Sequence, residues 1–262
     1  MNRISPIVKQ LLIINIIVYL GTTLSLNTDF IYNTLSLHFP ENSNFQIWQI
    51  LTHMFMHGGI AHLAFNMFAL WMFGTSVESI FGSNRFLFFY IACGLGAAIA
   101  QITYLYFIFY SDQQLLIASG YNSSQIIEIL HQIDVRRVSE ISVQFSHPEI
   151  ENLTSIVPEF SKFYFNFFSQ MVGASGAIMG VLVAFGMFFP ERQLMLIFLP
   201  IPIKAKYFIP GIILLDLFSA ITGKAIFSPN NTAFIAHIGG ALTGFLIMYY
   251  WKKNQFNRNR WY

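Results

Sequence analysis

A serine and a histidine lie in surroundings where their side chains could act together as a nucleophile and a base. Ser175 lies in the small-residue segment Gly173–Gly180, which leaves its hydroxyl accessible and allows a second helix to approach closely. His237 precedes a similar stretch that contains Gly240. Where two such stretches cross, the imidazole can remove the hydroxyl proton, and the serine then becomes a strong nucleophile. Each stretch by itself is also typical of ordinary helix packing.

A third polar group lies upstream, between His53 and Asn66. His62 and Asn66 are four residues apart, so a helix would present both on one face. Two such donors could stabilise the negative oxygen that forms when a nucleophile attacks a carbonyl. His53 and His57 have the same spacing, which also suits a zinc-binding pair. The glutamate of the H-E-x-x-H pattern is missing, however, and the spacing alone does not favour a metal site.

These residues belong to a strongly apolar chain. Of its 262 residues, 55% are hydrophobic and 10% are charged, and the mean hydropathy is +0.56. An ordinary soluble domain has about 25% charged residues. The composition therefore excludes a disordered chain, a nucleic-acid-binding protein and an ordinary soluble enzyme, and it indicates several membrane-spanning helices. The single cysteine, Cys93, excludes a disulfide framework and a cysteine-ligated metal.

Six segments have the apolar character of membrane-spanning helices, which need about 20 residues each. They cover about residues 7–26, 60–81, 86–110, 171–189, 207–222 and 234–251. We therefore predict an all-α polytopic membrane protein, a six-helix bundle that forms a single domain over residues 1–262. The polar segment 111–162 is predicted to be an insertion loop between the third and fourth spans. The first span lacks a convincing cleavage site and is interpreted as a retained helix.

The basic residues predict how these spans are oriented. Ten of the 14 Lys and Arg residues fall on the side that holds both termini, namely Arg3, Lys9, Arg85, Arg192, Lys204, Lys206, Lys252, Lys253, Arg258 and Arg260. Positive charge is concentrated in cytoplasmic loops, so we expect both termini in the cytoplasm and the 111–162 loop outside. The expected location is the bacterial inner membrane.

The ordered motifs resemble those of the rhomboid family of intramembrane serine proteases. They are His62-x-x-x-Asn66 in the second span, Gly173-Ala174-Ser175-Gly176 at the fourth and Ala236-His237-x-Gly239-Gly240 at the sixth. Supporting matches are Glu78-x-x-x-Gly82, Pro190-Glu191 and Asp216-Leu-Phe. The resemblance covers about residues 53–110 and 171–251, which is most of the chain outside the loop.

The resemblance implies a cavity that opens to the outer side and a Ser-His dyad within it. Ser175 would be the nucleophile and His237 the general base and acid, with no third acidic member. His62, Asn66 and the backbone N–H of Ser175 would bind the oxyanion. The substrates would be transmembrane segments of other proteins in the lipid bilayer, cleaved without a metal or another cofactor, and no nucleic acid would take part.

Five further residues would have supporting roles. His53 and His57 would be structural, and Glu78 would brace the cytoplasmic end of the second span. Gly240 would allow close helix packing. Met179 stands where some relatives carry an aromatic residue that stacks on the histidine, so the rate rather than the mechanism would differ.

Two other classes of function are alternatives to proteolysis. A non-proteolytic rhomboid-like adaptor that binds membrane proteins would be expected to lack Ser175 or His237, and this chain has both. A transporter or channel would be expected to carry ionisable residues in several spans. Asp216 is the clear case here, and it is interpreted as structural. The 111–162 loop could cap the cavity, contact substrates or act as a spacer, and the sequence indicates no oligomeric state.

Overall fold

The computed structural model describes residues 4–118, 120, 122, 124, 163, 165–196, 199–226 and 232–256. Five helices in this part of the chain are long and apolar enough to cross a membrane: Pro6–Thr23, Ile60–Phe81, Ser83–Ala118, Ala205–Thr222 and Phe234–Asn254. A sixth apolar helix, Ser175–Phe188, has 14 residues. The prediction of an all-α polytopic membrane protein is confirmed. The greater part of the predicted 111–162 insertion lies outside the described residues.

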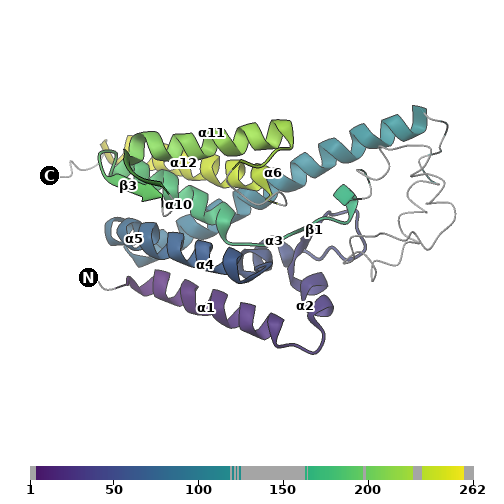
Figure 1. The fold of residues 1–262 in the computed structure, drawn as a ribbon, viewed down its shortest axis with the longest axis horizontal. Helices are drawn as coiled ribbons and strands as arrows, with labels where there is room; N and C mark the ends of the chain where they lie inside the picture. Colours follow the sequence, from purple (N-terminus) through teal and green to yellow (C-terminus); the bar gives the residue numbers. More distant parts are fainter. Residues whose placement is uncertain are drawn as a thin grey trace.

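The elements follow one another along the chain as short connectors between long helices (Figure 1). They are α1 (Pro6–Thr23), α2 (Thr28–Leu35), β1 (Leu37–His38), α3 (Gln49–Thr52), η1 (His53–Phe55), α4 (Ile60–Ala69), the π-helical turn η2 (Leu70–Gly74), α5 (Thr75–Phe81), α6 (Ser83–Ala118), β2 (Gln170–Met171), α10 (Ser175–Phe188), β3 (Gln193–Leu196), β4 (Leu199–Lys204), α11 (Ala205–Thr222) and α12 (Phe234–Phe256). Helices α4, η2 and α5 are continuous and together form one span. Within the described residues, four strands make two small antiparallel pairs, β1 with β2 and β3 with β4, and neither pair is predicted from the sequence.

Helix α10 is the central element of the bundle. It contacts α6 and α12 on one side and α4, α5 and α11 on the others (Figure 1). All residues from Gly176 to Phe185 are buried. A helix that is apolar all round is suited to this position, because every face meets another helix.

Glycines bring α12 very close to its neighbours. A Cβ atom added at Gly240 would lie 1.9 Å from the carbonyl oxygen of Gly176 in α10. A Cβ atom added at Gly239 would lie 2.9 Å from the carbonyl oxygen of Gly96 in α6. Backbones approach this closely only where side chains are absent. The first two turns of α12 are therefore held against the first turn of α10.

Helix α6 extends further than the predicted third span. It runs over 36 residues, from Ser83 to Ala118, and is therefore about 54 Å long. The apolar part of a bilayer is about 30 Å thick, which is less than the length of α6. In Figure 1 one end of α6 extends beyond the other helices. At this end Phe109 packs against Phe39, Phe163 and Phe167. The helix thus continues beyond the predicted membrane span of about residues 86–110, because the polar residues that follow are also helical.

The carboxylate of Glu78 joins the beginning of α1 to the end of α5. It accepts hydrogen bonds from the N–H groups of Ile7 at 3.0 Å and Val8 at 2.9 Å, and from the hydroxyls of Ser83 at 2.8 Å and Ser5. The first N–H groups of a helix have no partner within it, and a negative charge is favourable there. Glu78 therefore fixes the position of α1 against the second span.

Candidate active site

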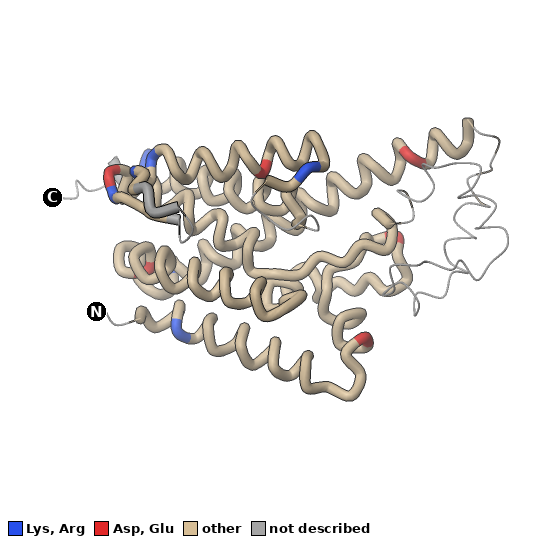
Figure 2. The backbone as a smooth tube through the Cα atoms, in the orientation of Figure 1, with Lys and Arg blue, Asp and Glu red and all other residues tan. Residues whose placement is uncertain are grey.

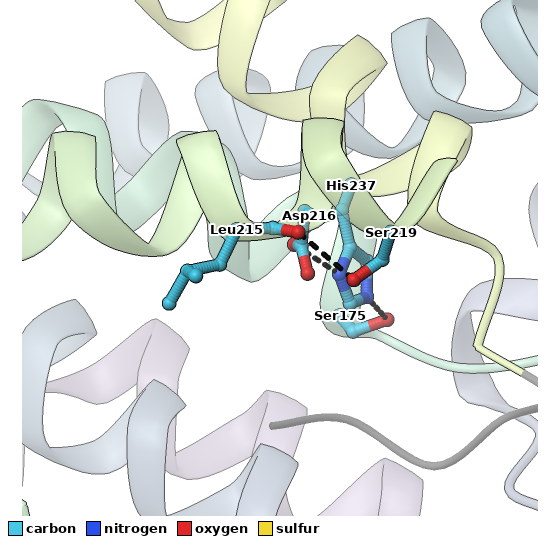
Figure 3. A network of polar contacts seen from close by, with 5 residues as sticks. All are labelled: Ser175, Leu215, Asp216, Ser219 and His237. Atoms are coloured by element: carbon cyan, nitrogen blue, oxygen red, sulfur yellow. Dashed lines mark hydrogen bonds and ion pairs between the residues drawn. The ribbon is translucent and has the colours of Figure 1, made fainter. Parts of the chain in front are cut away.

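Ser175 and His237 are in direct contact. Ser175 is the first residue of α10, and His237 lies in the first turn of α12. The Nε2 atom of His237 is 2.8 Å from the Oγ atom of Ser175 (Figure 3). The glycine contacts between α10 and α12 place these two helix ends together. The two residues that the sequence analysis chose as nucleophile and base are thus brought within hydrogen-bonding distance.

A carboxylate contacts the other nitrogen of the same imidazole. The Oδ2 atom of Asp216, in α11, is 2.8 Å from Nδ1 of His237 (Figure 3). Asp216 is buried. This contact is not predicted from the sequence, which favours a structural role for Asp216, and the resemblance implies no third acidic residue near the histidine. The two residues are 21 positions apart on different helices, so no local spacing indicates that they meet.

His62 and Asn66 lie beside the turn that leads to Ser175. A Cβ atom added at Gly173 would lie 2.8 Å from Nε2 of His62 and 3.7 Å from Nδ2 of Asn66. Gly173 also has a φ of +124°, which favours glycine. The Nδ2 group of Asn66 is buried and has no hydrogen-bond partner in the described part of the chain. It is therefore a donor that a substrate oxygen could use.

His53 and His57, which are predicted to be structural, contact this turn and the ring of His62. The carbonyl of His53 accepts a hydrogen bond from the N–H of Gly173 at 2.9 Å, and Nδ1 of His53 donates to the carbonyl of Gln49 at 2.8 Å. The ring of His57 packs edge-on against that of His62, with the centroids 5.1 Å apart. Burial lowers the pKa of both His53 and His57 to about 4, so both are neutral at neutral pH.

Two further contacts that the sequence analysis did not identify hold the same region. Strand β1 pairs with β2, with His38 opposite Gln170, and this ties the segment after α1 to the segment before Ser175. The hydroxyl of Tyr32 in α2 donates to the carbonyl of His57 at 2.7 Å. Neither contact has a recognisable signal in the sequence, since both join segments that are distant in the chain.

The remaining predicted site residues lie one turn into the two helices. Met179 is buried in the apolar core of α10, and Gly240 lies in the contact between α12 and α10. Within the residues that the structure describes, no three His, Cys, Asp or Glu side chains are grouped as a metal site requires. The groups that meet at this site are a hydroxyl, an imidazole, a carboxylate and a hydrogen-bond donor.

The chain is similar in sequence to a family of known proteins. A family profile described as "Rhomboid domain" matches residues 44–120 and 150–254. The chain is 51% identical to "Rhomboid protease GluP" of Bacillus subtilis (strain 168) over 57 residues, which cover 22% of this chain and 11% of that protein. It is 25% identical to "Presenilin-associated rhomboid-like protein, mitochondrial" of Rattus norvegicus over 233 residues, which cover 86% of this chain and 45% of the relative.

A third relative, "Rhomboid protease GlpG" of Salmonella choleraesuis (strain SC-B67), is 26% identical over 100 residues, which cover 38% of this chain and 36% of that protein. The chain thus spans less than half the length of each of these three curated relatives. The family profile, by contrast, matches more than half of this chain and includes all three motifs. The chain therefore belongs to the rhomboid family.

Proposed function

We propose that this protein is an intramembrane serine endopeptidase that uses Ser175 as its nucleophile and His237 as its base and acid. The observation that carries the proposal is the 2.8 Å contact between Ser175 Oγ and His237 Nε2 at the abutting ends of two helices. Family membership supports a protease-like function within the membrane. A hydroxyl in contact with a base is the arrangement that nucleophilic catalysis requires.

The reaction would proceed in two stages. The Nε2 atom of His237 takes the proton of Ser175 while Oγ attacks the peptide carbonyl, and the imidazolium then gives this proton to the departing amine. A water molecule next gives a proton to His237 and attacks the acyl ester, and the proton returns to Oγ as the new carboxyl product leaves. Both stages pass through a tetrahedral intermediate with a negative oxygen.

Three donors are proposed to bind that oxygen. The N–H of Ser175 has no partner within α10, because Ser175 is the first residue of the helix. The Nδ2 group of Asn66 is buried without a partner among the described residues, and His62 lies against the same turn. Donors held in place before the reaction are worth most in a site of low polarity.

The substrates are proposed to be transmembrane segments of other proteins. The peptide bonds of a membrane helix are protected by its own hydrogen bonds, so the helix must unwind before Ser175 can attack. Segments with glycine or other weak helix formers near the membrane surface should therefore be cleaved fastest. A uniform Ala/Leu segment cleaved at the same rate would contradict this part of the proposal.

The charge distribution supports an orientation for the site. The beginning of α1, the end of α12 and strands β3 and β4 lie at one end of the bundle, which also holds most of the described Lys and Arg residues (Figures 1 and 2). We propose that this end faces the cytoplasm or its equivalent and that the site opens on the opposite side. Two of the relatives are bacterial and one is named as mitochondrial, so the proposal concerns the two sides of a membrane rather than one compartment.

A cleavage assay in proteoliposomes tests the function. The substrate is a single-span protein with a glycine-containing outer turn, and wild type is compared with Ser175→Ala and Ser169→Ala. The Ser169 hydroxyl donates to the carbonyl of Asn166 at 2.9 Å and provides the matched control. We expect cleavage by wild type and Ser169→Ala and none by Ser175→Ala. Equal cleavage by all three proteins would contradict the proposal.

A further inference from the structure

The structure places a buried carboxylate against the imidazole that contacts Ser175. The Asp216 and His237 side chains are 7% and 13% exposed, and the Oδ2 and Nδ1 atoms are 2.8 Å apart. A carboxylate inside a membrane bundle is costly unless it is paired, so a partner at this distance accounts for its tolerance at this position. Helix α11 thereby contributes a side chain to a site that otherwise consists of α4, α10 and α12.

We infer that Asp216 is a positioning residue that orients His237 and stabilises the imidazolium formed during catalysis, so that the site works as a Ser-His-Asp triad. This inference rests on the proposed serine-protease function. A carboxylate can only accept a hydrogen bond, so Nδ1 of the neutral ring must carry the proton. The Nε2 atom is then left with a free lone pair, which it needs to accept the proton of Ser175.

Of the groups that the neighbouring helices contribute around His237, Asp216 is the one suited to this role. Helix α10 contributes Ser175, α4 contributes His62 near the site, and α11 contributes Asp216. Helix α6 faces Gly239, in the second turn of α12, with Gly96 and Ala100, which carry no titratable group. Among these contacts, Asp216 is the group that can carry a negative charge and so balance the positive ring in the transition state.

Substitution of Asp216 by Asn separates this role from a structural one. In a soluble Ser-His-Asp protease the equivalent Asp-to-Asn change lowers kcat by about 10⁴-fold because the ring takes the wrong tautomer. We expect Asp216→Asn to lower kcat by about 10²- to 10⁴-fold with little change in KM. The matched control is Ser219→Ala, which removes another buried polar group of α11, one that donates to Leu215 within the helix (Figure 3).

The tautomer of His237 gives a readout that a purely structural role would not move. A residue that orients the ring determines which ring nitrogen carries the proton, whereas a residue that only packs against it does not. Wild-type kcat in Asp216→Asn would overturn the inference.

A measurement on the wild-type protein covers the case in which Asp216→Asn does not fold. Nitrogen-15 NMR of histidine-labelled protein in detergent reports which ring nitrogen carries the proton, and His237→Gln identifies the signal. We expect the proton on Nδ1 at pH 8, and a proton on Nε2 would overturn the inference. Ser175→Ala, assayed in parallel, separates the two failures. If it cleaves like wild type, the proposed function fails. If it is inactive while Asp216→Asn is unchanged, only the inference about Asp216 fails.

Discussion

Replacement of Gly240 by Ala tests whether close helix contact assembles the site. The added Cβ would lie 1.9 Å from the carbonyl oxygen of Gly176, and carbon–oxygen contacts of this kind are normally about 3.3 Å or longer. The helices α10 and α12 must then separate by about 1.4 Å. Ser175 and His237 lie one and three residues before these glycines, so their 2.8 Å contact would lengthen to about 4 Å, beyond hydrogen-bonding range.

The expected loss of activity follows from this displacement. A shift of about 1 Å in a catalytic group can lower the rate by about 10²-fold, and overpacking of a core costs about 1–3 kcal/mol of stability. We therefore expect kcat/KM of Gly240→Ala to fall by at least about 10²-fold, whereas the protein still inserts and can be purified. The assay is cleavage of a single-span substrate in proteoliposomes at several substrate concentrations.

Gly211→Ala is the matched control for this experiment. It lies inside α11, and a Cβ there would meet no atom within 4 Å. Alanine is also the better helix former, so this variant should keep wild-type activity and stability. If Gly240→Ala showed wild-type kcat/KM, the close backbone contact would not be what aligns Ser175 with His237, and the structural reasoning would be wrong.

Three further predictions concern the oxyanion donor Asn66, the carboxylate of Glu78 that holds α1, and the buried histidines. Asn66→Ala should lower kcat by about 10²- to 10³-fold and leave weak activity, and a wild-type rate would remove Asn66 from the site. Glu78→Ala leaves two N–H groups of α1 without their acceptor, so thermal unfolding in detergent should show a loss of about 1–3 kcal/mol, with Glu78→Gln in between. His53 and His57 have a pKa of about 4 in the folded protein against 6.5 as the ordinary value, so the unfolded chain binds protons first as the pH falls. The free energy of unfolding should have its full value above about pH 6.5. It should decrease toward pH 4 by about 1.4 kcal/mol per pH unit for each histidine. Melting temperatures of wild type and His57→Phe at pH 7 and pH 5 check this. If the melting temperature of His57→Phe fell between these pH values by as much as that of wild type, the prediction would be contradicted.

The sequence predicts well those features that depend on local patterns. Long apolar runs indicate the membrane helices, and the all-α polytopic fold is confirmed. The spacing of His62 and Asn66 places both on one helix face, because four residues make about one turn. The ordered motifs around Ser175 and His237 led to the rhomboid family, which the family profile confirms. The catalytic roles of these residues and the effect of Met179 on the rate stay predictions.

Features that depend on contacts between distant segments could not be predicted in this way. The Asp216–His237 contact joins two helices whose relative rotation has no signature in either one. The pairing of β1 with β2 is two residues long in each strand, too short to produce a recognisable alternation. The full length of α6 could not be predicted from the apolar run, because a change from apolar to polar residues marks the membrane boundary rather than the end of a helix.

The most direct test of the central claim is covalent labelling of the nucleophile. A fluorophosphonate reacts with a serine hydroxyl only where a base activates it. Wild-type protein in detergent is treated with the reagent, and peptide mass spectrometry locates the adduct. We predict an adduct on Ser175 in wild type that disappears in His237→Ala together with cleavage. An adduct on another serine, or undiminished labelling of Ser175 in His237→Ala, would contradict activation of Ser175 by His237.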